Sequence, residues 1–169
     1  MDYALLSNSL NKIEKFSIKK IDDTLNFWMI RSKSGYFYQE YIENKFIALG
    51  WNYIDKSTVI NKQTTPILKE GIQDRYGDKK PMLAINKCLK FINQLKEGDY
   101  VIITDMGSNK IAICIIGEYY EEEIDYKKEI ESIKKIDNKE FEIDAIKCPY
   151  KKRRKIEILL EVSTKKNRI

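Results

Sequence analysis

Short apolar runs separated by polar segments divide the chain into strands and helices. Four apolar runs predict β-strands, at residues 27–30, 46–49, 100–104 and 111–116. Apolar positions spaced by three and four residues predict helices, over 36–45, over 67–73 with Pro66 in its first turn, and from Pro81 to just before Gly98. Two further strands are expected at 141–147 and 155–162, on either side of a basic segment.

This order of elements predicts one α+β domain. Since helical segments separate several of the strands, a curved mixed sheet or open β-barrel of about five or six strands, surrounded by helices, fits best. We place the domain at residues 26–162, after an N-terminal extension at 1–25 and before a tail or linker stub at 163–169. The charged segment 121–142 is expected to be a surface excursion.

The segment around the first two predicted strands concentrates aromatic and polar side chains. Trp28 and Trp51 are the only tryptophans of the chain, and they lie at the ends of these two strands. Arg31, Ser32 and Ser34 follow the first strand. If the strands are neighbours, the indoles and these polar groups meet at one rim of the sheet, which predicts a pocket for a flat, polar-edged ligand such as a nucleobase. The alternative is that both tryptophans are core residues.

The composition excludes several classes of catalytic site. The 169 residues include no histidine, which removes most zinc sites, serine–histidine and cysteine–histidine pairs, and histidine acid–base catalysis. The three cysteines, Cys88, Cys114 and Cys148, are odd in number and widely spaced. Cys88 and Cys114 have apolar neighbours, so we expect them to be buried thiols in a reducing, cytoplasmic compartment. No apolar run is long enough to span a membrane and the N-terminus lacks a secretory pattern, so no membrane partner is expected.

Charge is segregated along the chain, and the formal net charge is +5. Acidic residues cluster at 118–125 and basic residues at 147–155. Segregated charge indicates an electrostatic footprint better than the total does. We therefore expect nucleic-acid phosphates to be contacted by Lys151, Lys152, Arg153, Arg154 and Lys155, and the mouth of the tryptophan pocket to face this segment. A solvated surface stretch is the alternative.

Five segments, taken in order, resemble a known superfamily. They are an apolar strand ending in arginine, a strand ending in Gly-Trp, a helix–Gly-Asp–strand element, a strand running into glycine and two tyrosines, and the basic start of the last strand, at 27–31, 48–51, 91–102, 111–120 and 152–157. Their order and spacing are similar to those of the PUA-like superfamily, and within it to EVE-type domains related to the YTH readers of modified bases. Similar domains occur at the N-terminus of McrB-type restriction proteins and in other prokaryotic defence proteins. The resemblance extends over residues 26–162, although the segment 121–142 is longer and more charged than a minimal domain needs.

The resemblance implies a binding protein that breaks no bond. Its relatives hold a nucleobase, often methylated, in an aromatic cage after the base has left the stack. We therefore expect a sensor of a modified, flipped-out base in a prokaryotic restriction or anti-phage defence system. DNA is favoured over RNA, an effector domain or partner subunit is expected beside it, and neither a cofactor nor a metal ion is needed. The expected ligand site combines stacking faces, edge hydrogen bonds and a phosphate contact from Trp28, Arg31, Ser32, Ser34, Tyr36, Trp51 and Asp105.

Other classes of function compete with this prediction. An aromatic pocket would serve a free nucleotide as well as a flipped base, and a protein-interaction module is a further alternative. A metal-dependent nuclease is less favoured. Carboxylates at 121–123 and at Asp125 could bind a divalent ion, and 140–142 weakly resembles part of a nuclease motif, but no third carboxylate is placed with it. We therefore predict no catalytic activity.

Overall fold

The structure is a computed structural model of the chain, and it describes residues 24–138 and 146–163. The expected N-terminal extension, apart from its last two residues, and nearly all of the C-terminal tail lie outside the described residues. So does most of the strand expected at 141–147, whose last two residues are irregular.

Five strands form a single mixed sheet in the order β1-β3-β4-β5-β2. They are β1 (Phe27–Ile30), β2 (Phe46–Leu49), β3 (Tyr100–Thr104), β4 (Lys110–Glu121) and β5 (Lys152–Ser163). The β1–β3 pair is parallel and the other pairs are antiparallel. The four strands predicted at 27–30, 46–49, 100–104 and 111–116 thus share one sheet, and the expected α+β class with a mixed sheet is confirmed.

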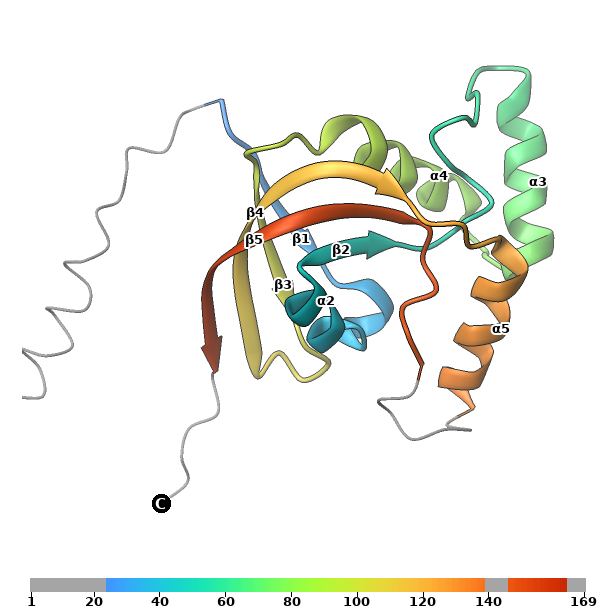
Figure 1. The fold of residues 1–169 in the computed structure, drawn as a ribbon. Helices are drawn as coiled ribbons and strands as arrows, with labels where there is room; N and C mark the ends of the chain where they lie inside the picture. Colours follow the sequence, from blue (N-terminus) through green and yellow to red (C-terminus); the bar gives the residue numbers. More distant parts are fainter. Residues whose placement is uncertain (1–23, 139–145, 164–169) are drawn as a thin grey trace, which may run out of the picture.

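The two longest strands, β4 and β5, bend strongly, and Figure 1 shows the sheet curling over α2 (Tyr38–Asn44). Two register shifts interrupt their pairing, one between Ile113 and Cys114 and one between Ile116 and Tyr119. Such bulges increase the local twist of a strand pair, which lets a sheet curl. The curled sheet does not close into a barrel, and β1 and β2 remain its two edges.

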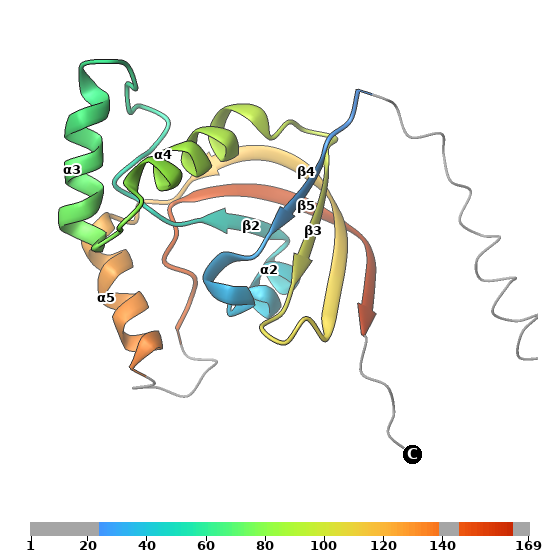
Figure 2. The same cartoon turned by 180° about the vertical axis from the view of Figure 1, so that it is seen from behind.

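The other helices gather where β2 ends (Figures 1 and 2). They are α3 (Thr64–Tyr76), α4 (Pro81–Leu89), which continues as the π-helical turn η2 (Lys90–Gln94), and α5 (Tyr126–Asp137). Asp125 caps α5, because its side chain accepts a hydrogen bond from the backbone N–H of Lys128. The segment 121–142, expected as a surface excursion, therefore contains an ordered helix.

Two hydrophobic clusters hold these layers together. The larger one joins the sheet to α2 through aromatic side chains such as Phe37, Tyr41 and Phe46. The smaller one packs α3 against α4 around Ile72 and Ile85. All three cysteines are buried and free, which confirms the buried thiols predicted at Cys88 and Cys114. In the part of the chain that the structure describes, no helix has the length and apolar character to cross a membrane.

Candidate ligand pocket between the two edge strands

A pocket of about 950 Å³ opens between the two edges of the sheet. Its walls come from β1, from the end of β2, from the α3–α4 region and from α5. Much of the lining is apolar, from Trp28, Ile30, Leu49, Trp51, Phe91, Leu95, Ile130, Ile133 and Tyr150. A curled sheet that does not close leaves room for a ligand between its edges.

Trp28 is a half-buried wall of the pocket, and a buried carboxylate holds its ring. The indole Nε1–H donates to Oδ2 of Asp99 over 2.8 Å. Asp99 is only 1% exposed, and it also accepts the backbone N–H groups of Asn26 at 3.0 Å and Lys96 at 3.1 Å. Burial raises the pKa of Asp99, but these hydrogen bonds lower it by more, so the pKa lies below its usual value. Because its N–H is used, Trp28 offers a ligand only its faces.

Trp51 lines a second wall of the pocket, two residues past the end of β2. Its backbone has a φ of 58°, a left-handed conformation that is uncommon for a residue with a side chain. Two polar groups hold that conformation: the Trp51 N–H donates to Oε1 of Glu129 at 2.7 Å, and its carbonyl accepts from Nζ of Lys152 at 2.8 Å. Nζ of Lys87 lies 5.5 Å from the centre of the indole, within the range of a cation–π contact.

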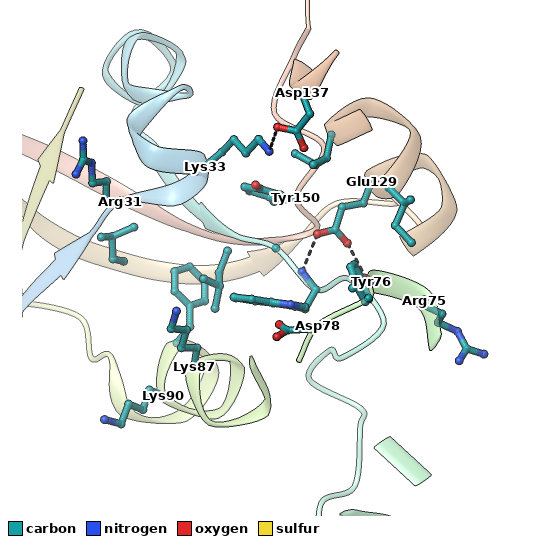
Figure 3. A pocket seen from close by; sticks show the side chains of 18 of the residues that line it. Arg31, Lys33, Arg75, Tyr76, Asp78, Lys87, Lys90, Glu129, Asp137 and Tyr150 are labelled. Atoms are coloured by element: carbon teal, nitrogen blue, oxygen red, sulfur yellow. Dashed lines mark hydrogen bonds and ion pairs between the residues drawn. The ribbon is translucent and has the colours of Figure 1, made fainter. Parts of the chain in front are cut away.

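Glu129 anchors this wall from α5. The side chain is buried, and it accepts hydrogen bonds from the N–H groups of Trp51 and Asn52 at 2.7 Å and from the hydroxyl of Tyr76 at 2.8 Å. Figure 3 shows the carboxylate directed at Tyr76 across the end of β2. Burial raises the pKa of Glu129, and the hydrogen bonds oppose this rise only in part.

The mouth of the pocket is predominantly cationic. Six basic residues line the pocket, namely Arg31, Lys33, Arg75, Lys87, Lys90 and Lys134. Only three acidic residues do so: Asp78, Glu129 and Asp137. Lys33 and Asp137 neutralise each other in an ion pair, which Figure 3 shows at the edge of the pocket. Within residues 24–138 and 146–163, Arg31, Lys87 and Lys90 form no ion pair. Together they favour an anionic ligand.

Of the residues predicted from sequence, the pocket unites Trp28, Arg31 and Trp51. Arg31 donates from Nη2 to the carbonyl of Met106, in the turn between β3 and β4, at 2.7 Å. The ends of 27–30 and 46–49 thus line one pocket, but the condition on which this was expected, that the two strands are neighbours, is wrong. Since β1 and β2 are opposite edges of the sheet, they do so through the curl of the sheet and without pairing.

Three other predicted ligand residues do not line the pocket, and their placement is corrected here. The side chain of Asp105 accepts the N–H groups of Asn109 and Lys110 and closes the β3–β4 turn. Tyr36 packs edge-on against Phe37 beside the main core. Ser34 is exposed in η1 (Ser32–Gly35). Ser32 lies in the same turn, and its role stays a prediction.

The prediction for the basic segment is wrong in its placement. Lys152 is 0% exposed, and its Nζ donates to the carbonyls of Trp51 and Ile54 at 2.8 and 2.6 Å. Arg154 is 5% exposed and donates to the carbonyls of Phe91 and Ile92. Side chains committed to buried carbonyls are not available to phosphates.

The remaining basic residues of this segment are engaged by neighbouring groups. Lys151 pairs with Asp55 at 2.7 Å and Glu121 at 3.4 Å. Arg153 donates to the carbonyls of Tyr150 and Cys148 and pairs with Glu122, whereas Lys155 is exposed beside Glu118. None of the five lines the pocket, so its mouth does not face this segment. From Lys152 on, the segment is a structural part of β5.

These pairings also account for most of the acidic cluster considered as a metal site. Glu121 and Glu122 form ion pairs, and Asp125 caps α5. The carboxylates of 140–142 lie outside the described residues. Within the residues described, no group of three or more histidine, cysteine, aspartate or glutamate side chains could hold a metal ion.

Sequence reasoning missed Asp99, Glu129 and the lysines of α4. Asp99 belongs to a Gly-Asp pair that reads only as a turn. Glu129 lies in a highly charged segment where nothing marks one carboxylate as buried. Lys87 and Lys90 could have been found, because they follow Pro81 at helical spacing and face no nearby acidic residue along the chain.

A comparison with protein families places the chain. A family model described as a domain of unknown function (DUF8426) matches residues 28–165. The chain belongs to this family. The matched residues begin at Trp28 and extend past the end of β5, so the DUF8426 match includes every residue that lines the pocket. No curated protein and no solved structure matches the chain.

Proposed function

We propose that this DUF8426 chain is a PUA-like, EVE-type binding domain that holds a modified, flipped-out nucleobase. The observation that carries the proposal is one pocket with an indole on each of two walls and, at its mouth, cations that pair with no carboxylate of the described residues. A nucleobase has the matching chemistry, since its flat faces stack on aromatic rings and its phosphates carry negative charge.

Stacking on the two tryptophans can supply the free energy that base flipping requires. Flipping a base out of a duplex costs a few kcal/mol, and stacking on one aromatic side chain contributes about 1–3 kcal/mol. The indole of Trp28 and that of Trp51 can together offset the flipping cost. Asp99 holds the indole of Trp28, and Glu129 holds the backbone of Trp51, so less ordering entropy is lost on binding.

The size of the pocket supports a ligand larger than a base alone. Ligand pockets measure about 300–1,000 Å³, and this one, at about 950 Å³, lies near the upper end of that range. It has room for a base together with its sugar and phosphate. The phosphate would lie by Arg31, Lys87 or Lys90 at the mouth.

Binding without catalysis is supported by how the carboxylates nearest the two indoles are used. The oxygens of Asp99 and Glu129 accept several hydrogen bonds from the protein itself. They are therefore positioning groups for the tryptophans, and neither stands free to transfer a proton. As part of the proposal, the domain acts as a sensor in a prokaryotic defence system, beside an effector domain or partner subunit.

Substitution of Trp51 tests the proposal. Binding of DNA and RNA oligonucleotides that carry methylated cytosine, methylated adenine or only unmodified bases is measured by fluorescence anisotropy with labelled strands. We expect one modified base to bind best. Trp51→Ala should weaken that binding by about 5- to 150-fold, equivalent to the roughly 1–3 kcal/mol of one stacked base.

Two variants control this experiment. Trp51→Phe keeps an aromatic face and should retain much of the affinity. Phe27→Ala removes an exposed ring of β1 that stacks on Tyr100 and does not line the pocket, so it should change base preference little. If affinity is equal for all bases and Trp51→Ala leaves it unchanged in a folded protein, the pocket does not read a base.

A further inference from the structure

We infer that the exposed lysines along α4 and η2 form a track for the sugar–phosphate backbone, so that the ligand is a base within a nucleic-acid strand and not a free nucleotide. The inference rests on the proposed function and names the class of ligand that the pocket takes. On this inference, the phosphate contacts that the sequence predicted at residues 151–155 are made instead by the lysines of α4, η2 and the residues beside them.

The segment that contains α4 and η2 carries basic residues but no acidic ones. Residues 79–96 include five lysines and no aspartate or glutamate: Lys79, Lys80, Lys87, Lys90 and Lys96. All five are exposed. In the parts of the chain that the structure describes, none of them forms an ion pair. The residues of 151–155, by contrast, are each bonded to carbonyls or carboxylates of the protein.

The lysines lie along the helix and beyond both of its ends. Lys90 follows Lys87 by three residues, so these two side chains lie on neighbouring parts of one helix face. Lys87 and Lys90 line the pocket. Lys79 and Lys80 lie before the start of α4, and Lys96 lies beyond the end of η2. Figure 3 shows Lys87 and Lys90 on the same helix at one side of the pocket.

The length of this face favours a nucleic-acid strand over a free nucleotide as the ligand. The α4 and η2 segments contain nine and five residues, and at 1.5 Å per residue they extend over roughly 20 Å. Phosphates of one DNA strand follow each other every 3.4 Å along the duplex axis, so roughly six nucleotides match this length. A free nucleotide in the pocket would contact Lys87 or Lys90 and leave the outer lysines without a ligand.

Two lysine variants separate the strand from the free nucleotide. The outer variant is Lys79→Gln, Lys80→Gln and Lys96→Gln together, and the rim variant is Lys87→Gln with Lys90→Gln. All five side chains are exposed, and glutamine keeps a similar helix propensity at Lys87 and Lys90, so folding should be preserved. The probes are a DNA and an RNA oligonucleotide carrying the preferred base, the nucleoside monophosphate of that base, and polyglutamate, each titrated at several salt concentrations.

We expect the outer variant to bind the oligonucleotide more weakly, with a salt slope shallower by about 0.7–0.9 for each phosphate that a lysine no longer neutralises. Its affinity for the monophosphate should be unchanged. The rim variant should weaken both ligands. A matched control, Lys127→Gln with Lys128→Gln, removes two exposed lysines of α5 that do not line the pocket, and it should leave both affinities as they are.

An outer variant with wild-type affinity and salt slope would overturn the inference, and so would polyglutamate binding as tightly as the oligonucleotide. Failure of the proposed function looks different. In that case Trp51→Ala would leave oligonucleotide binding unchanged while the outer lysines still mattered, which would retain the track and reject the pocket.

Discussion

At the scale of single residues, Asp99 determines what Trp28 can do. Its carboxylate is buried, with the indole N–H and two backbone N–H groups as donors. Without this hydrogen bond, the half-buried ring would be held only by its packing against the core. Fixing the ring before a ligand arrives lowers the entropy that binding loses.

Replacing Asp99 with asparagine tests this role. Asn can accept with its carbonyl oxygen, but its NH₂ group must face a donor that the second carboxylate oxygen accepted before. We expect Asp99→Asn to lower the free energy of unfolding at pH 7 by about 1–3 kcal/mol. Urea denaturation measures the difference, and binding of the modified oligonucleotide should weaken with it because the Trp28 ring is less well held.

The pH dependence of the same variant gives an independent check. The pKa of Asp99 is lowered in the folded protein, so its stabilising contribution is complete above the unfolded pKa of about 3.9. That contribution is lost as the pH falls through the lower, folded pKa. The stability difference between wild type and Asp99→Asn should therefore be constant near neutral pH and shrink below about pH 4. A difference that stays constant in acid would show that the Asp99 charge does not matter.

Pocket residues could be predicted from sequence where both the residue type and its position in the chain were unusual. Trp28, Trp51 and Arg31 were found because strand ends with aromatic rings are unusual. Asp105 and Ser34 were predicted to lie at the pocket but do not line it. Polar side chains in turns most often form hydrogen bonds with the nearby backbone, as Asp105 does. Asp99 could not be singled out, since its burial arises from the packing of β1 beside β3.

At the scale of elements, the junction of β2 with α5 shapes the second wall of the pocket. Gly50 separates Leu49 from Trp51, and a Cβ at this position would lie 2.7 Å from Oε1 of Glu129 and 3.0 Å from a ring carbon of Tyr150. The absence of a side chain thus lets α5 approach close enough to bond the backbone of Trp51.

We expect Gly50→Ala to destabilise the fold by about 1–3 kcal/mol, the usual cost of overpacking. A double-mutant cycle with Glu129→Ala identifies the cause. If the clash with Glu129 is responsible, Gly50→Ala should cost much less in the Glu129→Ala background than in wild type. Thermal and urea unfolding of the four proteins give the coupling, and strict additivity would contradict this account of the junction.

Elements with continuous apolar runs were predictable, and elements defined by tertiary contacts were not. The β3–β4 hairpin and α2 lie close to their expected positions because their patterns are strong. The helix α5 was missed, since it is charged throughout and its apolar positions, Ile130, Ile133 and Ile136, form a narrow stripe. Its placement against the pocket depends on Glu129, which no local pattern reveals.

At the scale of the whole molecule, β5 connects parts of the chain that are far apart in sequence. It pairs with both β2 and β4, and its alternate residues Lys152, Arg154 and Ile156 are buried. This period of two is that of a strand. A run of basic residues looks solvated from composition alone. Its burial becomes favourable only through carbonyl groups that are distant in sequence, in the loop after β2 and in η2.

Substitutions along β5 should therefore act on stability and not on nucleic-acid affinity. We expect Lys152→Met to lower the free energy of unfolding by about 1–3 kcal/mol, since the carbonyl of Ile54 loses its donor and the carbonyl of Trp51 keeps only the N–H of Ile54. Lys155→Gln, at an exposed position of the same strand, should change stability by less than about 0.5 kcal/mol. Urea denaturation compares the two, and an equally stable Lys152→Met protein would show that the buried ammonium is dispensable.

The placement of both tryptophans in one pocket has a spectroscopic consequence. The chain has eleven tyrosines but only two tryptophans, and both line the same cavity. Light absorbed selectively by indole therefore yields emission from this cavity alone, without a background from the rest of the molecule. The emission of the unlabelled protein, separated into its two sources by Trp28→Phe and Trp51→Phe, reports on the hydration and occupancy of each wall in turn.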